Sequence, residues 1–425
     1  MRKSPFVHAR KREQGQTLAI VAFSLVSLFA MAALGIDVAS LYSARGEAQR
    51  AADAVALAGA KAFVDSGFTT TPNNPDVKTL AESMATGYIN AAVSKNNVGG
   101  TPPTVQSATF DDTTHPGNPQ VTVKVQQTSL PIFFSKIWGV TLLSVSATAV
   151  AEAYNPSNSQ TDGGSFVASA PSCVKPLVIP NTDKTSGNAY IDPEKGAVTG
   201  SFIGEPINLS SQCQPSRGGR RRGGGTTCPT KPASVNAGSY VPIQPMPASP
   251  STPASTPSCP ACARGGLPLE QSLECCDMNI YQCGRNNPKA SVQITYQGYG
   301  DTTTFFSLQE CAMKPFGLPA DTLDTSNYPT APMKITANSG PSSGQLVNTS
   351  NSIMTFPIFD NSSDPSTGQV TVIGFLQVFV NSVGFTTGQI NGTVLNVVGC
   401  GDNPSAASPV SGGGASPIPV RLIHN

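Results

Sequence analysis

The chain has 425 residues, of which 77 are glycine or proline, about 18% where about 12% is usual. Charged residues make up only 12%, roughly half the usual fraction, which excludes a coiled-coil rod, an acidic solvating tail and a typical charge-rich cytosolic enzyme. The net charge is +1, but residues 1–12 hold five basic side chains and no acidic one. The remainder therefore carries −4 and has no general electrostatic attraction to nucleic acid.

The first predicted element is a membrane-spanning helix. Thr17 to Ile36 is an uncharged run of 20 residues, and as an α-helix it would be about 30 Å long, the thickness of a bilayer core. Three basic residues lie shortly before it: Arg10, Lys11 and Arg12. The positive-inside rule then predicts that residues 1–16 stay in the cytoplasm and that residues 37–425 lie on the exported side.

Two other interpretations of this run are less consistent with the sequence. A cleaved secretory signal has an apolar region of only about 7–15 residues followed by a small-residue cleavage site, whereas here the helical pattern continues past Ile36. A buried core helix of a soluble domain rarely has 20 uncharged residues behind a basic cluster. We therefore expect a single-pass membrane protein.

The helix is expected to continue beyond the membrane, because residues 37–64 are rich in alanine and contain no proline. Small or apolar residues recur there at spacings of three, four and seven, which places them on one helix face: Leu41, Ala48, Ala52, Val55 and Gly59. Small side chains allow close approach, so this face is predicted to pack on a soluble domain or on a partner helix. Gly67 and the run Thr69–Pro72 should end the helix.

The next segment predicts one α+β layer. A second helix is expected over residues 76–93, and strands are expected over 105–110, 120–127 and 144–154. An antiparallel sheet with helices packed on one of its faces forms a stable unit of two layers.

A specific pattern runs over residues 12–60: Arg12, Gly15, Gln16, Asp37, Val38, Leu41, Tyr42, Arg45 and the run from Gln49 to Ala60. This pattern resembles the TadE/TadG-like proteins of tight-adherence (Flp) pilus assembly, and more precisely their TadG-like N-terminal module. The resemblance continues more weakly to Ala153 and implies a pilin-like fold for residues 37–154. It also implies a non-enzymatic component of pilus assembly, anchored in the bacterial inner membrane, whose partners are the membrane and other pilus-assembly proteins.

Two departures from related proteins affect this interpretation. Prepilins are cut after a glycine and carry glutamate five residues later, but Gly15 is followed at that place by Ile20, so we expect the anchor to be retained. Larger relatives contain a von Willebrand A domain with the metal motif Asp-x-Ser-x-Ser. Asp324, Asp360 and Asp364 each begin Asp-x-Ser, but none of them completes the motif.

Beyond a polar linker at 155–165, residues 166–425 are predicted to form an exported, loop-rich and mainly β region, periplasmic or otherwise exposed in the envelope. Apolar or alternating runs predict strands, the clearest being the pair 369–380 and 389–398. Residues 206–262 hold almost nothing that could form a core and predict a disordered Gly/Pro/Arg/Ser insert.

All ten cysteines lie on the predicted exported side: Cys173, Cys213, Cys228, Cys259, Cys262, Cys275, Cys276, Cys283, Cys311 and Cys400. An even number in an oxidising compartment favours disulfides, although the pairing cannot be derived from spacing. Two alternatives are a redox pair at Cys259 and Cys262, and a zinc site built from these two with Cys275, Cys276 and Cys283. The first lacks a strand–helix context, and the spacing of the second is irregular.

The remaining motifs do not favour an enzyme. The three histidines are far apart in the sequence, and the arginine–glycine run 217–225 is neither a P-loop nor a dinucleotide-binding turn. We therefore expect no catalytic residue, cofactor, metal, nucleic acid or small-molecule substrate. The alternative functions are a generic anchored adhesion or structural protein of the cell envelope and an exported thiol or zinc protein.

Overall fold

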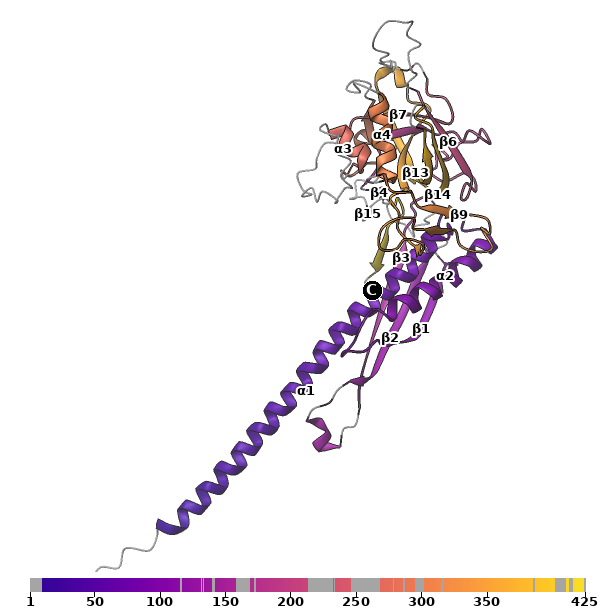
Figure 1. Cartoon of the computed structure of the whole chain (residues 1–425). Helices are drawn as coiled ribbons and strands as arrows, with labels where there is room; N and C mark the ends of the chain where they lie inside the picture. The colour runs from indigo at the N-terminus through magenta and orange to yellow at the C-terminus, as the bar shows by residue number, and fades with distance from the viewer. Residues whose placement is uncertain are drawn as a thin grey trace, which may run out of the picture.

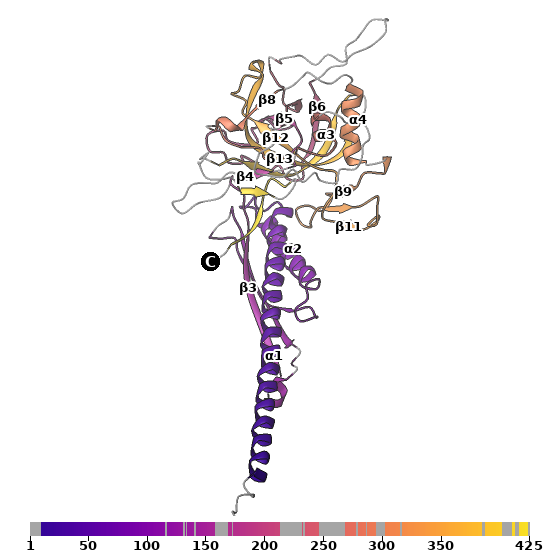
Figure 2. The ribbon, with the colours of Figure 1, turned by 90° about the vertical axis from the view of Figure 1, so that its left-hand side faces the viewer.

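The computed structural model describes residues 10–114, 117–130, 132, 134–139, 142–157, 169–171, 173–212, 232, 234–245, 268–277, 279–285, 287–294, 302–314, 317–384, 387–401, 410–412 and 416–423. A single long helix leads into a layer of strands, and a β-rich body lies at the end of that helix farther from its N-terminus (Figure 1). A second view, turned by 90°, shows the same arrangement (Figure 2).

Two helices build the first layer. Helix α1 (Arg10–Asp65) is continuous over 56 residues, so the predicted extension beyond the apolar run is confirmed. It stops just before Gly67, whose φ of 80° lies in the left-handed region that favours glycine. Helix α2 (Pro75–Val93) begins with the side chain of Asn74 accepting from the N–H groups of Asp76 and Val77, and it packs against α1.

A four-stranded antiparallel sheet covers the other side of α1. Its strand order is β1 (Thr104–Asp111), β2 (Gln120–Leu130), β3 (Leu143–Ala153) and β16 (Val420–Ile423). The first three strands follow the prediction, whereas β16 comes from the far end of the sequence and was not predicted. Alternate residues of β2 and β3 are buried toward α1, among them Val121, Val123, Ala149 and Ala151.

The outer body is built on a sheet that closes on itself. The strands follow the order β12 (Ile353–Phe359), β5 (Leu177–Pro180), β7 (Ser239–Pro242), β6 (Pro206–Ser211), β14 (Ile390–Gly399) and β13 (Gln369–Val383), and β12 pairs with β13 to complete the ring. Strand β8 (Ser291–Gln293) pairs antiparallel with the first residues of β13. The predicted strand pair is confirmed as the antiparallel pair β13–β14.

Smaller elements surround this ring. They are a sheet of β9 (Thr322–Asp324), β10 (Lys334–Thr336) and β11 (Leu346–Val347), the parallel pair β4 (Ser169–Pro171) and β15 (Val410–Gly412), and the helices α3 (Pro268–Glu274) and α4 (Thr302–Met313). Short 3-10 turns occur at η1 (Ser135–Trp138), η2 (Pro288–Ala290) and η4 (Pro365–Thr367). The α+β class is therefore confirmed, with strands dominating beyond β3.

The prediction that residues 206–262 contain almost no core is wrong at the start of that segment and around residue 240. Ile207 and Leu209 of β6 are buried, and so are Tyr240 and Val241 of β7. These short apolar runs are flanked by glycine and proline, so a composition averaged over the whole segment hides them. Residues 213–231, together with 233 and 246–262, lie outside the described part of the chain.

Two hydrophobic cores differ in composition. The core around α1 is dominated by alanine and valine, whereas the core of the outer ring contains large side chains such as Tyr281, Phe356 and Phe375. Val398 of β14 is buried in the alanine-rich core, and Tyr328 packs against both cores. The two cores therefore meet at one junction.

Candidate membrane anchor and packing interface

The first half of α1 presents apolar side chains that nothing in the described structure covers. Eleven large apolar side chains between Leu18 and Ile36 are each at least 48% exposed. Removing one such side chain from water stabilises by about 1.5–3 kcal/mol. By length and composition, the described helix from Gln16 onward can span a membrane. Helix α1 begins at Arg10, and the side chains of the predicted basic anchor, Arg10, Lys11 and Arg12, lie outside the described ones.

Polar side chains within the apolar run are satisfied inside the helix. The hydroxyl of Ser24 donates to the carbonyl of Ile20 at 2.8 Å, and that of Ser27 donates to the carbonyl of Phe23 at 2.9 Å. Since unsatisfied polar groups are costly in hydrocarbon, this half of α1 is compatible with lipid on all sides.

The second half of α1 is enclosed by protein. Of the predicted face, Ala48, Ala52 and Val55 are fully buried and Leu41 is half-buried. The buried surface is wider than the predicted stripe because the sheet covers one side of α1 and α2 covers another. It also includes Ala44, Ala51, Ala56, Ala60, Ala62 and Phe63.

Gly59 marks the closest approach in this interface. A Cβ atom added there would lie 2.9 Å from Cγ1 of Val121 in β2 and 3.1 Å from Cδ1 of Ile89 in α2. Real Cβ atoms essentially never show contacts below 3.0 Å. The sheet and α2 therefore pack against the bare backbone of α1 at this residue.

Asp37, the first residue after the apolar run, connects α1 to the tip of the β2–β3 hairpin. Its carboxylate is buried and accepts from the backbone N–H of Phe134 at 3.0 Å and that of Ser135 at 2.6 Å, as well as from the Ser135 hydroxyl. These groups belong to the start of η1, whose first N–H groups have no partner within the turn. The sequence indicated Asp37 as the first residue after the apolar run and as one of the residues shared with the TadE/TadG-like proteins. It did not indicate the partner of Asp37, which lies 97 residues away.

The comparison with protein-family models concerns this same helix. Residues 15–62 match the family model described as "Putative Flp pilus-assembly TadE/G-like". The resemblance is therefore confirmed for this TadE/G-like segment, which includes both the exposed half and most of the enclosed half of α1. Searches of the curated proteins and of the solved structures found no match.

A polar junction ties the C-terminal end of the TadE/G-like helix to the outer ring. The Thr70 hydroxyl donates to the carbonyl of Val397 at 3.3 Å, and the Tyr328 hydroxyl donates to the carbonyl of Ser66 at 3.1 Å. The amide of Asn155, a fully buried residue at the start of the predicted linker, donates to the carbonyl of Thr69 at 2.9 Å. These bonds hold the end of the helix to three segments that are distant from it in sequence.

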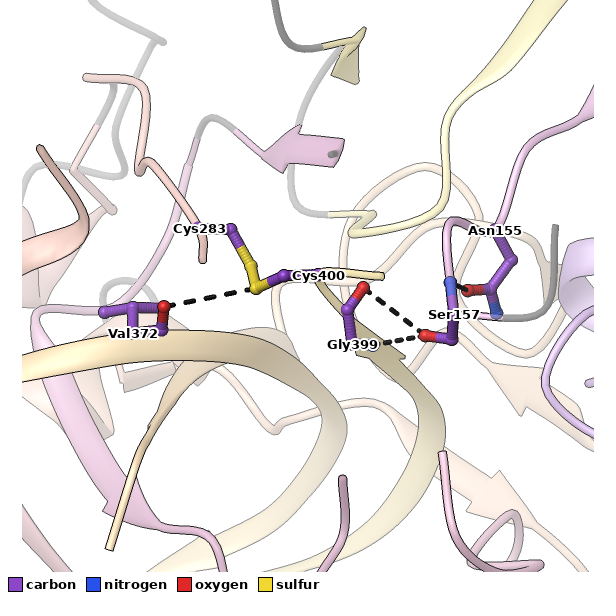
Figure 3. The surroundings of a disulfide bond; sticks show 6 residues. All are labelled: Asn155, Ser157, Cys283, Val372, Gly399 and Cys400. Atoms are coloured by element: carbon purple, nitrogen blue, oxygen red, sulfur yellow. Dashed lines mark hydrogen bonds between the residues drawn. A yellow bond between two sulfur atoms is a disulfide. The ribbon is translucent and has the colours of Figure 1, made fainter. Parts of the chain in front are cut away.

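A disulfide lies next to this junction. Figure 3 shows Cys283 bonded to Cys400, while the neighbouring Gly399 exchanges hydrogen bonds with the Ser157 hydroxyl through both its N–H and its carbonyl. The bond joins residues 117 apart in sequence. The disulfide ties the end of β14 to Cys283, and the hydrogen bonds of Gly399 with Ser157 hold the same end beside the segment that follows β3.

The described cysteines are all oxidised. Cys173 pairs with Cys276, and Cys275 and Cys311 are also disulfide-bonded. Disulfide bonding removes the thiolates that the zinc alternative requires of Cys275, Cys276 and Cys283. The redox alternative at 259 and 262, together with Cys213 and Cys228, lies outside the described residues.

A buried lysine lies beside the Cys173–Cys276 disulfide. The ammonium of Lys175 donates to the carbonyls of Leu273 and Cys275 at the end of α3, where the helix dipole favours a positive charge. Burial lowers the pKa of Lys175 to about 7, and the nearby Glu274 carboxylate opposes this shift. Lys175 therefore acts as a C-terminal cap for a short helix.

The three Asp-x-Ser sequences are turns. Each aspartate accepts a hydrogen bond from the backbone N–H two residues later: Asp324 from Ser326, Asp360 from Ser362 and Asp364 from Ser366. At Asp324 and Asp364 the hydrogen bond from the serine side chain, and after it this backbone bond, hold the pKa of the carboxyl below its usual value. Among the described residues, no group of three His, Cys, Asp or Glu side chains is placed to hold a metal ion.

A cavity of about 550 Å³ opens between the helices α1 and α2 on one side and the outer body on the other. Asp65 and Tyr88 line it from the helices, and Ile335 of β10 and Met333, just before that strand, line it from the outer body. Tyr88 donates to Asp65 at 3.0 Å, and Lys61 pairs with the same carboxylate. Burial and this carboxylate raise the pKa of Tyr88, so its hydroxyl stays protonated as a donor.

Proposed function

We propose that the chain is a membrane-anchored, non-enzymatic component of tight-adherence (Flp) pilus assembly. Residues 17–36 would span the bacterial inner membrane once, with the N-terminal segment in the cytoplasm and residues from Asp37 onward in the periplasm or exposed in the envelope. The observation that carries this proposal is the family match over residues 15–62, which falls on an uncovered apolar helix continuing into a packed one.

The architecture supports the role of a stiff support that holds the outer body away from the bilayer. From Asp37 to Asp65 the helix rises about 42 Å at 1.5 Å per residue. A lone helix of that length would bend, but this one is held between α2 and a sheet for most of that distance. The junction at its end then fixes the outer ring, which is the part available to other pilus-assembly proteins.

The test is a non-polar deletion of the gene followed by counting of surface filaments by electron microscopy. We expect filaments to disappear and to return with the full chain. They should not return with a form in which residues 1–36 are replaced by a cleavable secretory signal, since the outer body is then exported without its anchor.

The matched control replaces only residues 17–36 by an unrelated apolar helix of the same length. It should restore filaments if the span is a simple anchor, and failure here would assign the span a role in partner recognition. Normal filaments in the deletion strain would contradict the proposal and favour an anchored adhesion or structural protein of the envelope.

A further inference from the structure

We propose that the tip of the β2–β3 hairpin, the described residues around η1, is a second membrane contact. It would lie in the headgroup region of the exported leaflet, beside the point at which α1 leaves the bilayer. This inference rests on the anchor proposed above and adds a site to it: the exported part of the chain would touch the lipid surface as well as being attached to it.

The position of the tip follows from the Asp37 carboxylate. Asp37 is the first residue after the apolar run, and its side chain holds the backbone of Phe134 and Ser135 within hydrogen-bond distance. Figure 1 shows the hairpin extending past the end of the sheet along α1, with η1 beside the helix. If residues 17–36 lie in the bilayer core, η1 lies at the level where the hydrocarbon gives way to headgroups.

The composition of the tip fits that level. In the sequence, nine of the 14 residues from 130 to 143 are apolar, and Lys136 is the only charged one. Of the apolar side chains described there, Leu130 and Ile132 are buried, and Phe134 and Leu143 are half-buried. Leu142 is 67% exposed, and Lys136 is exposed next to the buried Ser135. Apolar and aromatic residues with a neighbouring lysine are typical of segments that lie in the interface of anionic membranes.

The face of α1 at the same level supports lipid as the occupant. Val38 and Tyr42, within the first two turns beyond the span, are exposed, and tyrosine is enriched where helices cross the membrane–water boundary. The charge of Asp37, which would oppose approach to lipid, is covered by the donors of η1. The apolar surface of the helix and that of the hairpin tip therefore meet the bilayer at one height.

The chain contains a single tryptophan, Trp138, in η1, so the test needs no added label. The full-length chain is reconstituted into liposomes of phosphatidylcholine and phosphatidylglycerol that carry bromine either near the headgroup or deep in the acyl chain. We expect Trp138 fluorescence to be quenched more strongly by the shallow bromine than by the deep one. Iodide in the aqueous phase should quench it less in liposomes than after unfolding in urea.

Two matched variants link the signal to the surface. Leu142→Asp places a charge on an exposed side chain of the tip, so it should cause loss of most of the lipid quenching without affecting the fold. Leu346→Asp makes the same change at a leucine of similar exposure, 65%, on β11 of the outer body, and it should leave the quenching unchanged.

The possible failures can be distinguished. A chain that does not float with the liposomes would overturn the anchor and this inference together. A chain that floats while Trp138 stays unquenched by either bromine and open to iodide would overturn this inference alone. Shielding from iodide without lipid quenching would also overturn it, in favour of a protein that covers the tip, either a second copy of the chain or another envelope protein.

Discussion

Replacing Gly59 by alanine tests the packing of α1 where it is tightest. In a helix interior alanine is favoured over glycine by about 0.8–1 kcal/mol, so an added methyl group should stabilise the chain wherever there is room for it. At Gly59 the new Cβ would lie 2.9 Å from Val121 and 3.1 Å from Ile89, and both neighbours are buried. Overpacking a core of this kind costs about 1–3 kcal/mol.

The matched control is Gly46→Ala, in the same helix, where an added Cβ meets nothing within 4 Å. This variant should be stabilised only by the higher helix propensity of alanine, by about 0.8–1 kcal/mol. The difference in stability between the two variants then gives the steric cost, and Gly59→Ala should be less stable than Gly46→Ala by about 1–3 kcal/mol. In hydrogen exchange limited by local opening this corresponds to about 5- to 150-fold faster exchange of amides in β2 and α2, since 1.4 kcal/mol is a factor of ten.

The assay is hydrogen–deuterium exchange of the full chain in lipid nanodiscs, followed by mass spectrometry of peptides from β2 and α2. A third variant, Gly59→Ala combined with Val121→Ala, opens space for the new methyl group and should recover part of the protection. If Gly59→Ala exchanges as slowly as Gly46→Ala, the helix and sheet are not in the contact described, and the enclosed half of α1 is not a rigid support.

Three further predictions concern the outer body and its attachment. Arg421→Ala should destabilise the pairing of β16 with the sheet by about 1.5–3 kcal/mol, since the buried Glu152 loses the charged partner that reaches it at 2.5 Å. Arg421→Lys should cost less, and hydrogen exchange of the β16 peptide measures both variants. The free energy of unfolding in urea, with disulfides intact, should rise from pH 7 to pH 9, because folded Lys175 loses its proton near pH 7 whereas unfolded Lys175 keeps it to about pH 10.5. An equal rise in the Lys175→Met variant would contradict this prediction. Replacing Cys283 and Cys400 together by serine should lower the free energy of unfolding by up to about 4.7 kcal/mol, the value for a closed loop of about 100 residues, and an unchanged urea midpoint would show that the junction does not depend on the bond.

Local patterns in the sequence predict the elements near the N-terminus well. An apolar run of 20 residues, a small-residue face with helical spacing and alternating strands each carry their signal within a window of about 10 to 20 residues. Helix α1 and the strand pair β13–β14 follow directly from such signals. Strands β6 and β7 were not predicted, because each buries only a few side chains between glycine and proline.

The contacts that hold the parts together have no local signature. Asp37 meets Ser135 across 98 residues, Ser157 meets Gly399 across 242, and Arg421 meets Glu152 across 269. Spacing in one sequence contains no information on which distant segments become neighbours. For the same reason the pairing of Cys173 with Cys276 could not be derived from the sequence.

The position of β16 has a consequence for the order in which the chain can mature. Strand β3 ends at Ala153, and the strand that covers its edge begins at Val420, after more than 260 further residues. Because synthesis proceeds from the N-terminal side, α1 and the first three strands emerge early, with one hydrogen-bonding edge of β3 unoccupied. Such an edge readily pairs with another chain. A chain interrupted anywhere before β16 would keep that edge open, whatever the state of its outer ring. Occupancy of the β3 edge thus distinguishes a finished molecule from an unfinished one, and an assembly partner that contacts this edge would recognise the difference.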